Sequence, residues 1–378
     1  MDFSTHKPVK IICGNNAIEE NCELFSKCGK RAIIVSGKHS ADKSGAFEAV
    51  RLALLKAGCT YVRFARIPEN PPASLCHEAG ETARRELCDF VIGIGGGSAL
   101  DSAKAVAAYA ANPMCGVMDI YDDTLRINES LPVIEIPTTA GTGSEACRYS
   151  VLTIDGGERK KTYKSPSSYA KYSFVCPKFT KTLSENYTIS TALDALAHAL
   201  ESYLSPKSTE KSEEAALYAA REVWDVIFRG ADSEGDRDVG GFTAKQRERL
   251  MYAACAAGIA IDYTGTGFPH PLGYSITLTR GVPHGRACAI FEGEFINYNM
   301  KTPEGEHRIK KIADYIGVEP SKMAEMIPEK SGVNLSIDKQ EREKLIDRVA
   351  GAGNYKNSPY VISREEMSEI YASAFGEK

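Results

Sequence analysis

The sequence has no long apolar run and little net charge. No stretch approaches the roughly 18 apolar residues that span a bilayer, and the opening MDFSTHKPVK lacks the apolar core of a signal peptide. We therefore expect a cytoplasmic protein with no membrane partner. The formal net charge is -4, from 46 basic and 50 acidic residues. Because binding to nucleic acid needs an excess of positive charge, we expect no nucleic-acid partner either.

The chain also lacks paired cysteines. Its 11 cysteines are spread singly from Cys13 to Cys288, with no CxxC pair. Neither a zinc finger nor a disulfide-rich scaffold is therefore indicated. We interpret the cysteines as reduced thiols, most of them small core residues.

A length of 378 residues exceeds what one hydrophobic core normally supports, so two domains are expected. In the first half, β-branched runs at 31–36, 60–67, 88–95 and 131–137 alternate with amphipathic segments at 44–58 and 72–87. This alternation predicts a largely parallel sheet sandwiched by helices. We predict an α/β dinucleotide-binding domain over residues 1–181.

After about residue 180 the periodicity becomes helical and no convincing strand remains. The segments with helical periodicity are 190–204, 209–229, 244–262, 286–298, 306–316 and 363–375. In the last of these, Ser363 and Glu366 predict a capping box, and Gly376 predicts its end. We predict an all-α metal-binding domain over residues 182–378, with a ligand cleft between the two domains.

Three histidines and one aspartate in the second half suit a divalent metal. Asp194 and His198 lie four residues apart, so on a helix they share one face about a turn apart. His270 and His284 are followed by Pro271 and Gly285, which favour positions at element ends, where side chains can converge. Taken alone, the first pair could also be a surface hydrogen bond.

Two glycine-rich loops in the first half suit a nucleotide. The predicted strand at 90–94 runs into Gly95, Gly96, Gly97 and Ser98, and a helical segment follows directly. Glycines there let backbone amides approach a pyrophosphate at a helix N-terminus. Ser98 is the expected N-cap, with Asp101 at the third position. The second loop, 137–145, is rich in hydroxyls and glycines, although neither loop matches the GxGxxG or P-loop pattern.

The turn after the first predicted strand of the alternating region bears on which dinucleotide binds. Residues Gly37 and Lys38 stand where NAD sites commonly carry a carboxylate for the ribose 2'-hydroxyl. A glycine and a lysine leave space and positive charge for a 2'-phosphate, which favours NADP(H) over NAD(H). The alternative is an ordinary surface turn.

With these features in order along the chain, the sequence resembles the iron-containing (group III) alcohol dehydrogenase family. The matching segments are GIGGGSALDSAKAVA, IPTTAGTGSEA, DALAHALESYLS and PHPLGYSITLTRGVPHGRA. The resemblance implies a Rossmann-like N-terminal domain, a helical C-terminal domain in the dehydroquinate synthase-like architecture, and a divalent metal, usually iron. It also points to NADP, because NAD-preferring members commonly carry aspartate at Gly37.

The resemblance implies Asp194, His198, His270 and His284 as metal ligands. The cofactor-binding residues predicted from the resemblance and from the turn are Gly37, Lys38, Asn70, Gly96, Gly97, Ser98, Asp101, Thr138, Thr139, Thr142, Ser144, Lys161 and Val175. Many members carry a further histidine four residues after the third ligand. Here that position is Tyr274, which is either a catalytic hydrogen-bond donor or a core tyrosine bonded to a backbone carbonyl.

The predicted function is a metal-dependent alcohol dehydrogenase or aldehyde reductase acting on a short-chain alcohol, diol or aldehyde. With no cysteine ligand in evidence, Fe(II) is favoured, and zinc or another divalent ion is the alternative. We also expect a homodimer. The alternatives are a glycerol dehydrogenase-like enzyme, a dehydroquinate synthase, a metal-free maleylacetate reductase and a non-catalytic nucleotide-binding or filament subunit of the same fold. The complete ligand set argues against the metal-free relative.

Overall fold

The structure is a computed structural model that describes residues 1–376. The chain forms two compact units. The first, here called the α/β unit, comprises Met1–Glu185 together with Ser233–Gly258. The second, the helical unit, comprises Asn186–Asp232 and the described residues from Ile259 onwards. The domain boundary placed at residue 181 from the sequence stays a prediction.

A six-stranded parallel sheet forms the centre of the α/β unit, in the order β1-β8-β5-β4-β2-β3. The predicted Rossmann-like α/β fold is confirmed, and four of the strands fall within the predicted runs. Two four-residue strands were missed, the edge strand β1 and its neighbour β8. The strands are β1 Lys10–Cys13, β2 Arg31–Ser36, β3 Thr60–Phe64, β4 Phe90–Gly95, β5 Val133–Pro137 and β8 Tyr172–Val175.

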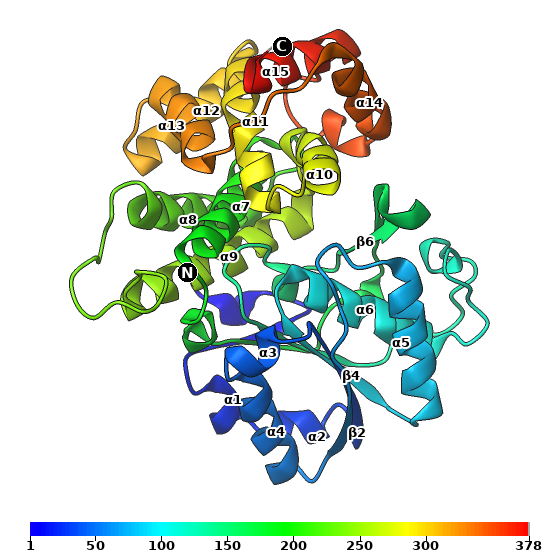
Figure 1. Cartoon of the computed structure of the whole chain (residues 1–378). Coiled ribbons are helices and arrows are strands. Elements are labelled where there is room, and N and C mark those ends of the chain that lie inside the picture. Colours follow the sequence, from blue (N-terminus) through cyan, green and yellow to red (C-terminus); the bar gives the residue numbers. More distant parts are fainter. Residues whose placement is uncertain (377–378) are drawn as a thin grey trace. The chain divides into compact units, whose positions relative to one another are not determined.

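Helices cover both faces of this sheet (Figure 1). Successive strand residues alternate between two apolar cores, since side chains of a strand point to opposite faces. Ile34 packs with the helices on one side, and its neighbours Ile33 and Val35 pack with those on the other. The first side carries α1 Ala17–Glu20, α2 Glu23–Ser26, α3 Ser40–Lys43 and α4 Ala46–Lys56, and the second carries α5 Ala73–Arg85 and α6 Gly97–Ala111.

The strand order brings the candidate nucleotide loops to one edge of the sheet. All neighbouring strands are parallel, so their carboxyl ends lie at the same edge. From β2 the chain moves outward to β3, then returns to β4 on the other side of β2 and continues to β5. Ligands in open α/β sheets bind outside the carboxyl ends of the strands at such a reversal. The turns after β2 and β4 flank this point.

Two further segments complete the α/β unit. A hairpin of β6 Ser150–Ile154 and β7 Arg159–Tyr163 forms a separate antiparallel sheet that the sequence analysis did not predict. The segment Ser233–Gly258 includes the first part of α9 Ala244–Thr264. Its buried Arg247 donates to the carbonyl oxygen of Leu183 and to the carboxylate of Asp238, which ties the segment to the end of the preceding α/β chain.

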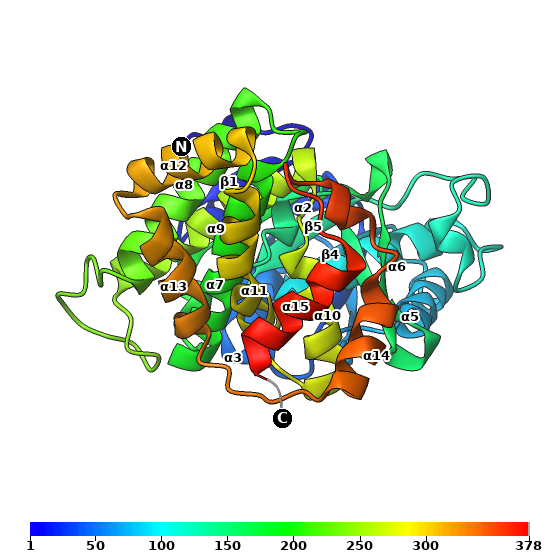
Figure 2. The ribbon, with the colours of Figure 1, turned by 90° about the horizontal axis from the view of Figure 1, so that it is seen from above.

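The helical unit confirms the predicted all-α second half. Helices α10, α13 and α14 were not predicted as helices. The Ser363–Glu366 capping box and the end of the last helix at Gly376 are confirmed. Figure 2 shows α14 beside both α10 and α15. The helices are α7 Glu185–Leu204, α8 Glu210–Ile227, α10 Pro269–Arg280, α11 His284–Asn299, α12 Pro303–Ile316, α13 Pro320–Ser331, α14 Lys339–Val349 and α15 Arg364–Phe375.

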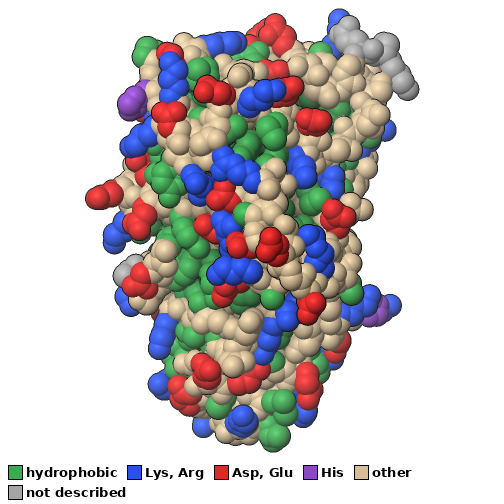
Figure 3. All heavy atoms as spheres, turned by 90° about the vertical axis from the view of Figure 1, so that its left-hand side faces the viewer, with side chains coloured by type: hydrophobic (Ala, Val, Ile, Leu, Met, Phe, Trp, Pro, Cys, Tyr) green, Lys and Arg blue, Asp and Glu red, His purple; other side chains and the backbone are tan. Residues whose placement is uncertain are grey.

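Charge is well mixed on the face drawn in Figure 3, where basic and acidic side chains alternate and neither sign forms a broad field. This agrees with the near balance of the two signs in the sequence. Among residues 1–376, no helix combines the length and apolar character that crossing a membrane requires.

Candidate metal centre and cofactor loops

Helix α7 supplies the first two candidate ligands from one face, as the four-residue spacing predicts. The side chains of Asp194 and His198 are 4% and 7% exposed. The alternative of a surface hydrogen bond is therefore wrong. Oδ1 of Asp194 lies 4.0 Å from Nε2 of His198, which is too long for a hydrogen bond.

The other two candidate ligands come from the starts of two helices. His270 is the second residue of α10, and His284 is the first residue of α11. Both positions agree with the prediction from the following proline and glycine. Gly285 permits the approach of α11 to α7, because a Cβ atom there would lie only 1.8 Å from the carbonyl oxygen of Ser190.

All three imidazoles face one carboxylate oxygen. Nε2 of His270 and Nε2 of His284 each lie 3.7 Å from Oδ1 of Asp194, and His198 lies at the 4.0 Å given above. This oxygen is buried and accepts no hydrogen bond. Two metal–ligand bonds of about 2.1 Å that meet at one ion at a right angle or wider place their ligand atoms about 3.0 to 4.2 Å apart. The spacing and the chemistry of the four donors therefore fit a divalent metal.

Glu201, one turn beyond His198 on α7, orients a candidate ligand. Its Oε1 lies 2.6 Å from Nδ1 of His270, and its other oxygen accepts from the backbone N–H of Gly267. A proton on Nδ1 of His270 leaves Nε2 as the electron-pair donor that faces Asp194. Carboxylates commonly hold metal-binding histidines in this way. Burial, together with the neighbouring Glu201, raises the pKa of Glu292 well above its ordinary range.

A thiol also lies in this cluster, although no cysteine ligand was in evidence from the sequence. One donor atom each from Asp194, His270, His284 and Cys288 lie within 4.8 Å of one another. Cys288 is one helical turn after His284 on α11 and is buried. The i,i+4 spacing of these two residues, identical to that of Asp194 and His198, is the signal that could have found it.

Tyr274 lies beside the candidate ligands, one turn after His270. Its ring stacks on the imidazole of His284, with centroids 4.9 Å apart and planes 20° apart. It also contacts the His270 ring edge-on at a centroid distance of 6.1 Å. Tyr274 is half-buried. A catalytic role for its hydroxyl stays a prediction.

In the α/β unit, the two predicted glycine loops touch each other. Positions Gly96 and Gly97 face Thr139 and Thr142: a Cβ atom on Gly97 would lie 2.6 Å from the methyl group of Thr142. The backbone N–H of Thr138 donates to the carbonyl oxygen of Gly95 at 2.8 Å. Glycine is needed because any side chain at 97 would separate the loops. The structure thus brings together these predicted cofactor residues.

The predicted cap of α6 was wrong. The N-cap is Gly96, without a side-chain hydrogen bond, and Ser98 is the second residue of the helix. The helix begins two residues earlier than expected, and Gly95, which precedes the N-cap, adopts a φ of +151°. Asp101 instead accepts from the hydroxyl of Ser144 at 2.5 Å and from the N–H of Val151 at 2.8 Å. Backbone amides at the start of α6 therefore have no capping side chain.

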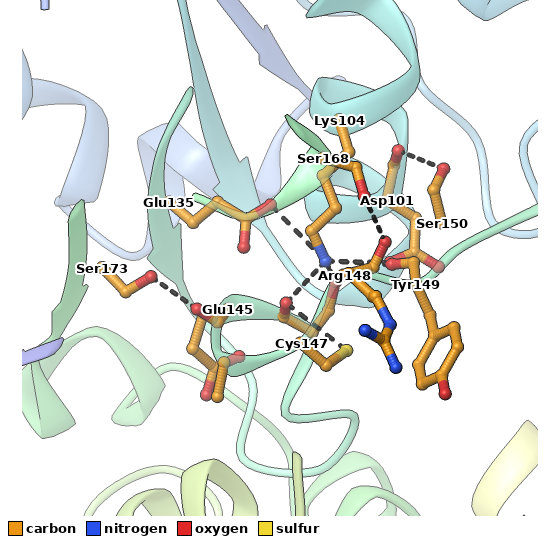
Figure 4. Close-up of polar contacts among 12 residues, drawn as sticks. Asp101, Lys104, Glu135, Glu145, Cys147, Arg148, Tyr149, Ser150, Ser168 and Ser173 are labelled. Atoms are coloured by element: carbon orange, nitrogen blue, oxygen red, sulfur yellow. Dashed lines mark hydrogen bonds and ion pairs between the residues drawn. The ribbon is translucent and has the colours of Figure 1, made fainter. Parts of the chain in front are cut away.

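A buried lysine ties the second loop to α6 (Figure 4). Nζ of Lys104 donates to the carbonyl and hydroxyl oxygens of Ser144, at 2.6 and 2.8 Å, and to the carbonyl of Tyr149 at 3.0 Å. It also lies 3.8 Å from Glu135 and 3.9 Å from Asp101. Burial opposes the charge of Lys104, but these carboxylates raise its pKa. The sequence analysis missed both Lys104 and Glu135.

The remaining predicted cofactor residues lie at several places. Gly37 and Lys38 follow β2, with Lys38 exposed, and Asn70 follows β3 in the left-handed region at a φ of +53°. Val175 is the buried last residue of β8. These four are at the carboxyl edge of the sheet. Lys161, by contrast, is on the β6–β7 hairpin, where its ammonium lies 4.6 Å from the ring centroid of Tyr121.

Because Glu145 is buried at the end of the second loop, we expect the stability of the folded protein to depend on pH. Burial raises its pKa from 4.5 to about 7. The folded protein therefore holds a proton that the unfolded chain releases, and stability falls as pH rises between these values. We expect the free energy of unfolding of the wild type to fall by an amount on the order of 2 kcal/mol between pH 4.5 and 7. In Glu145→Gln this decrease should be absent. Thermal melts of both proteins across this range check it, and parallel pH profiles would contradict it.

Comparison with known proteins decides the family. The model "Iron-containing alcohol dehydrogenase" matches residues 8–177, and the model "Fe-containing alcohol dehydrogenase family, C-terminal" matches residues 188–375. The chain belongs to the iron-containing alcohol dehydrogenase family. It is an NAD(P)-dependent oxidoreductase of alcohols or aldehydes.

Individual members of the iron-containing alcohol dehydrogenase family match over nearly the full chain. A sulfoacetaldehyde reductase of Bilophila wadsworthia is 30% identical, over 100% of this chain and 94% of its own length. An NADPH-dependent butanol dehydrogenase of Clostridium saccharobutylicum is 26% identical over 97% of both chains. An iron-containing alcohol dehydrogenase structure from Thermotoga maritima has a TM-score of 0.89 at 31% identity and covers 98% of both chains.

Proposed function

We propose that this enzyme binds Fe(II) through Asp194, His198, His270 and His284 and uses NADP(H) to interconvert a short-chain alcohol or diol and its aldehyde. The observation that carries the proposal is the buried Asp194 oxygen, which accepts no hydrogen bond and faces three imidazole nitrogens at 3.7 to 4.0 Å. The family membership supports the reaction class. We further propose that the enzyme is a homodimer.

The residues of the centre suit catalysis rather than purely structural metal binding. When bound, the ion supplies Lewis-acid polarisation of the substrate oxygen, and the nicotinamide carries the hydride. One carboxylate balances only half of a divalent charge, and the three imidazoles add none. Glu201 holds the His270 ring, and the half-buried Tyr274 stacks on the ring of His284. The four donors therefore preserve the net positive charge that stabilises a developing oxyanion.

The main test is a spectrophotometric screen of NADPH oxidation against a panel of aldehydes. The enzyme is reconstituted with Fe(II) under anaerobic conditions, and matched samples receive zinc or no metal. We expect turnover that depends on Fe(II) and is highest with short-chain aldehydes. Absence of turnover with every aldehyde, in protein shown to contain iron, would contradict the proposal.

The absence of a carboxylate at Gly37 supports a preference for NADPH. We expect Gly37→Asp to reverse this preference by at least about 10-fold in the kcat/KM ratio, because an aspartate repels the 2'-phosphate. The variant should fold, since the nearest atom to an added Cβ is the flexible Ser40 hydroxyl at 3.1 Å. Steady-state kinetics with both cofactors check it. A wild-type enzyme that favours NADH would refute the preference.

We also predict that Tyr274 acts in the reaction. Tyr274→Phe removes only the hydroxyl and keeps the ring stacked on His284. We expect kcat/KM to fall about 10-fold or more, equivalent to about 1.4 kcal/mol, with little change in melting temperature. If activity holds while the melting temperature drops, the hydroxyl is structural instead.

A further inference from the structure

Cys288 is the single cysteine of the helical unit, and its place is specific. The other 10 cysteines fall in the α/β unit. Its Sγ lies 3.6 Å from Nδ1 and 3.7 Å from Nε2 of His284, on the same helix. Its donor atom belongs to one compact group with those of Asp194 and His270. Burial of a thiol in an apolar core would not require three candidate metal ligands as its neighbours.

The backbone of α10 leaves space for this thiol. Gly273 faces Cys288, and a Cβ atom at position 273 would lie 2.9 Å from Sγ. A larger residue at 273 would push the sulfur or the helix away. The glycine thus permits the thiol to lie between α10 and α11, the two helices that carry His270 and His284.

We propose that Cys288 is an alternative metal ligand, so that the centre offers two ligand sets that share Asp194, His270 and His284. A hard or borderline ion such as Mn(II) or Fe(II) completes the first set with His198. Zinc, and cobalt(II) as its spectroscopic substitute, completes the second set with the sulfur of Cys288. This inference rests on the proposed metal site and extends it to the choice between metals.

The chemistry of the donors explains the two sets. Zinc binds tetrahedral sets of Cys, His and carboxylate donors, and soft thiolates select zinc over manganese. The compact group of Asp194, His270, His284 and Cys288 supplies one such set. His198 is outside that group, at 4.0 Å from Asp194. The sulfur and His198 are thus separate candidates for the fourth position.

The choice of set changes the electrostatics of the centre. With His198 as fourth ligand, one negative charge faces the two positive charges of the ion. A coordinating thiol is deprotonated, so the set that contains Cys288 is neutral overall. A neutral centre withdraws less electron density from a substrate oxygen. We therefore expect the zinc-loaded enzyme to be slower than the iron-loaded enzyme.

The test replaces the native metal with cobalt(II), which reports its ligands through its spectrum. We expect the wild-type protein to bind one cobalt ion and to show a thiolate-to-cobalt charge-transfer band in the near ultraviolet. Cys288→Ser should lose this band while keeping the visible cobalt bands. Cys288→Ala serves as a second variant in case the serine hydroxyl disturbs packing. Cys176→Ser, an equally buried cysteine in the α/β unit, is the matched control and should keep the band.

Metal affinities give a second readout. Cys288→Ser should lower zinc affinity by at least about 10-fold, the smallest loss typical of weakened metal sites, and leave Mn(II) affinity unchanged. His198→Ala should do the reverse. A wild-type cobalt spectrum without the thiolate band, or a band that persists in both Cys288 variants, overturns the inference while the metal site stands. Both proposals fail if the wild type binds no metal, or if His284→Ala binds the metal as the wild type does.

Discussion

Replacing His284 with alanine is expected to remove the metal and abolish turnover while the protein stays folded. His284 belongs to both proposed ligand sets, so neither Fe(II) nor zinc keeps four donors. Changes that only disturb the orientation of a ligand already cost about 10- to 100-fold in affinity, and loss of a ligand should cost more. Elemental analysis of the purified variant, with steady-state assays and a melting curve, measures the effect.

The control is His307→Ala, which removes an exposed histidine of the same unit on α12. This variant should keep the metal content and activity of the wild type. Full metal occupancy with normal turnover in His284→Ala would show that the four residues are not a metal site.

Lys104→Met is the second substitution with a large expected effect. It removes a fully buried ammonium and leaves the carboxylate of Glu135, whose two oxygens accept no hydrogen bonds, without its nearest positive charge. Breaking a buried pair in this way costs about 3 to 5 kcal/mol. Because Lys104 also holds Ser144, we expect a higher KM for the cofactor as well.

A double-mutant cycle separates the two roles of Lys104. Adding Glu135→Leu to Lys104→Met should restore much of the lost thermal stability, since no buried carboxylate remains at 135. The KM for the cofactor should stay high, because Ser144 is still released. Strictly additive losses in stability would show that Lys104 and Glu135 do not interact.

The sequence predicted the parts of the fold that have strong periodicity. Strand β4 is an apolar run buried on both faces, and α15 carries a complete capping box. Strands β1 and β8 have only four residues each, too few for a pattern to stand out. Helix α13 contains Pro328, which argues against a helix in the sequence, although the helix continues past it.

The candidate metal site was more predictable than its surroundings. Fixed spacing on α7 places Asp194 and His198, and the same rule would have found Cys288 from His284. Glu201 could also have been found from the sequence, because it is the next residue on the helix face that carries Asp194 and His198. Lys104 and Glu135 could not be paired from the sequence, because their contact depends on how α6 packs against β5. Long-range pairing of this kind follows from the tertiary structure alone.

The proposed metal site would make the stability of the fold depend on the supply of the ion. The buried carboxylate oxygen of Asp194 faces three imidazole nitrogens at 3.7 to 4.0 Å, which suits a shared ion better than hydrogen bonds. An ion that binds only the folded chain stabilises it by an amount that grows with the ion's free concentration. When the free metal ion is scarce, the folded protein would be less stable, would open more often and would be degraded faster. The abundance of the enzyme would then follow the availability of that ion without any dedicated sensor.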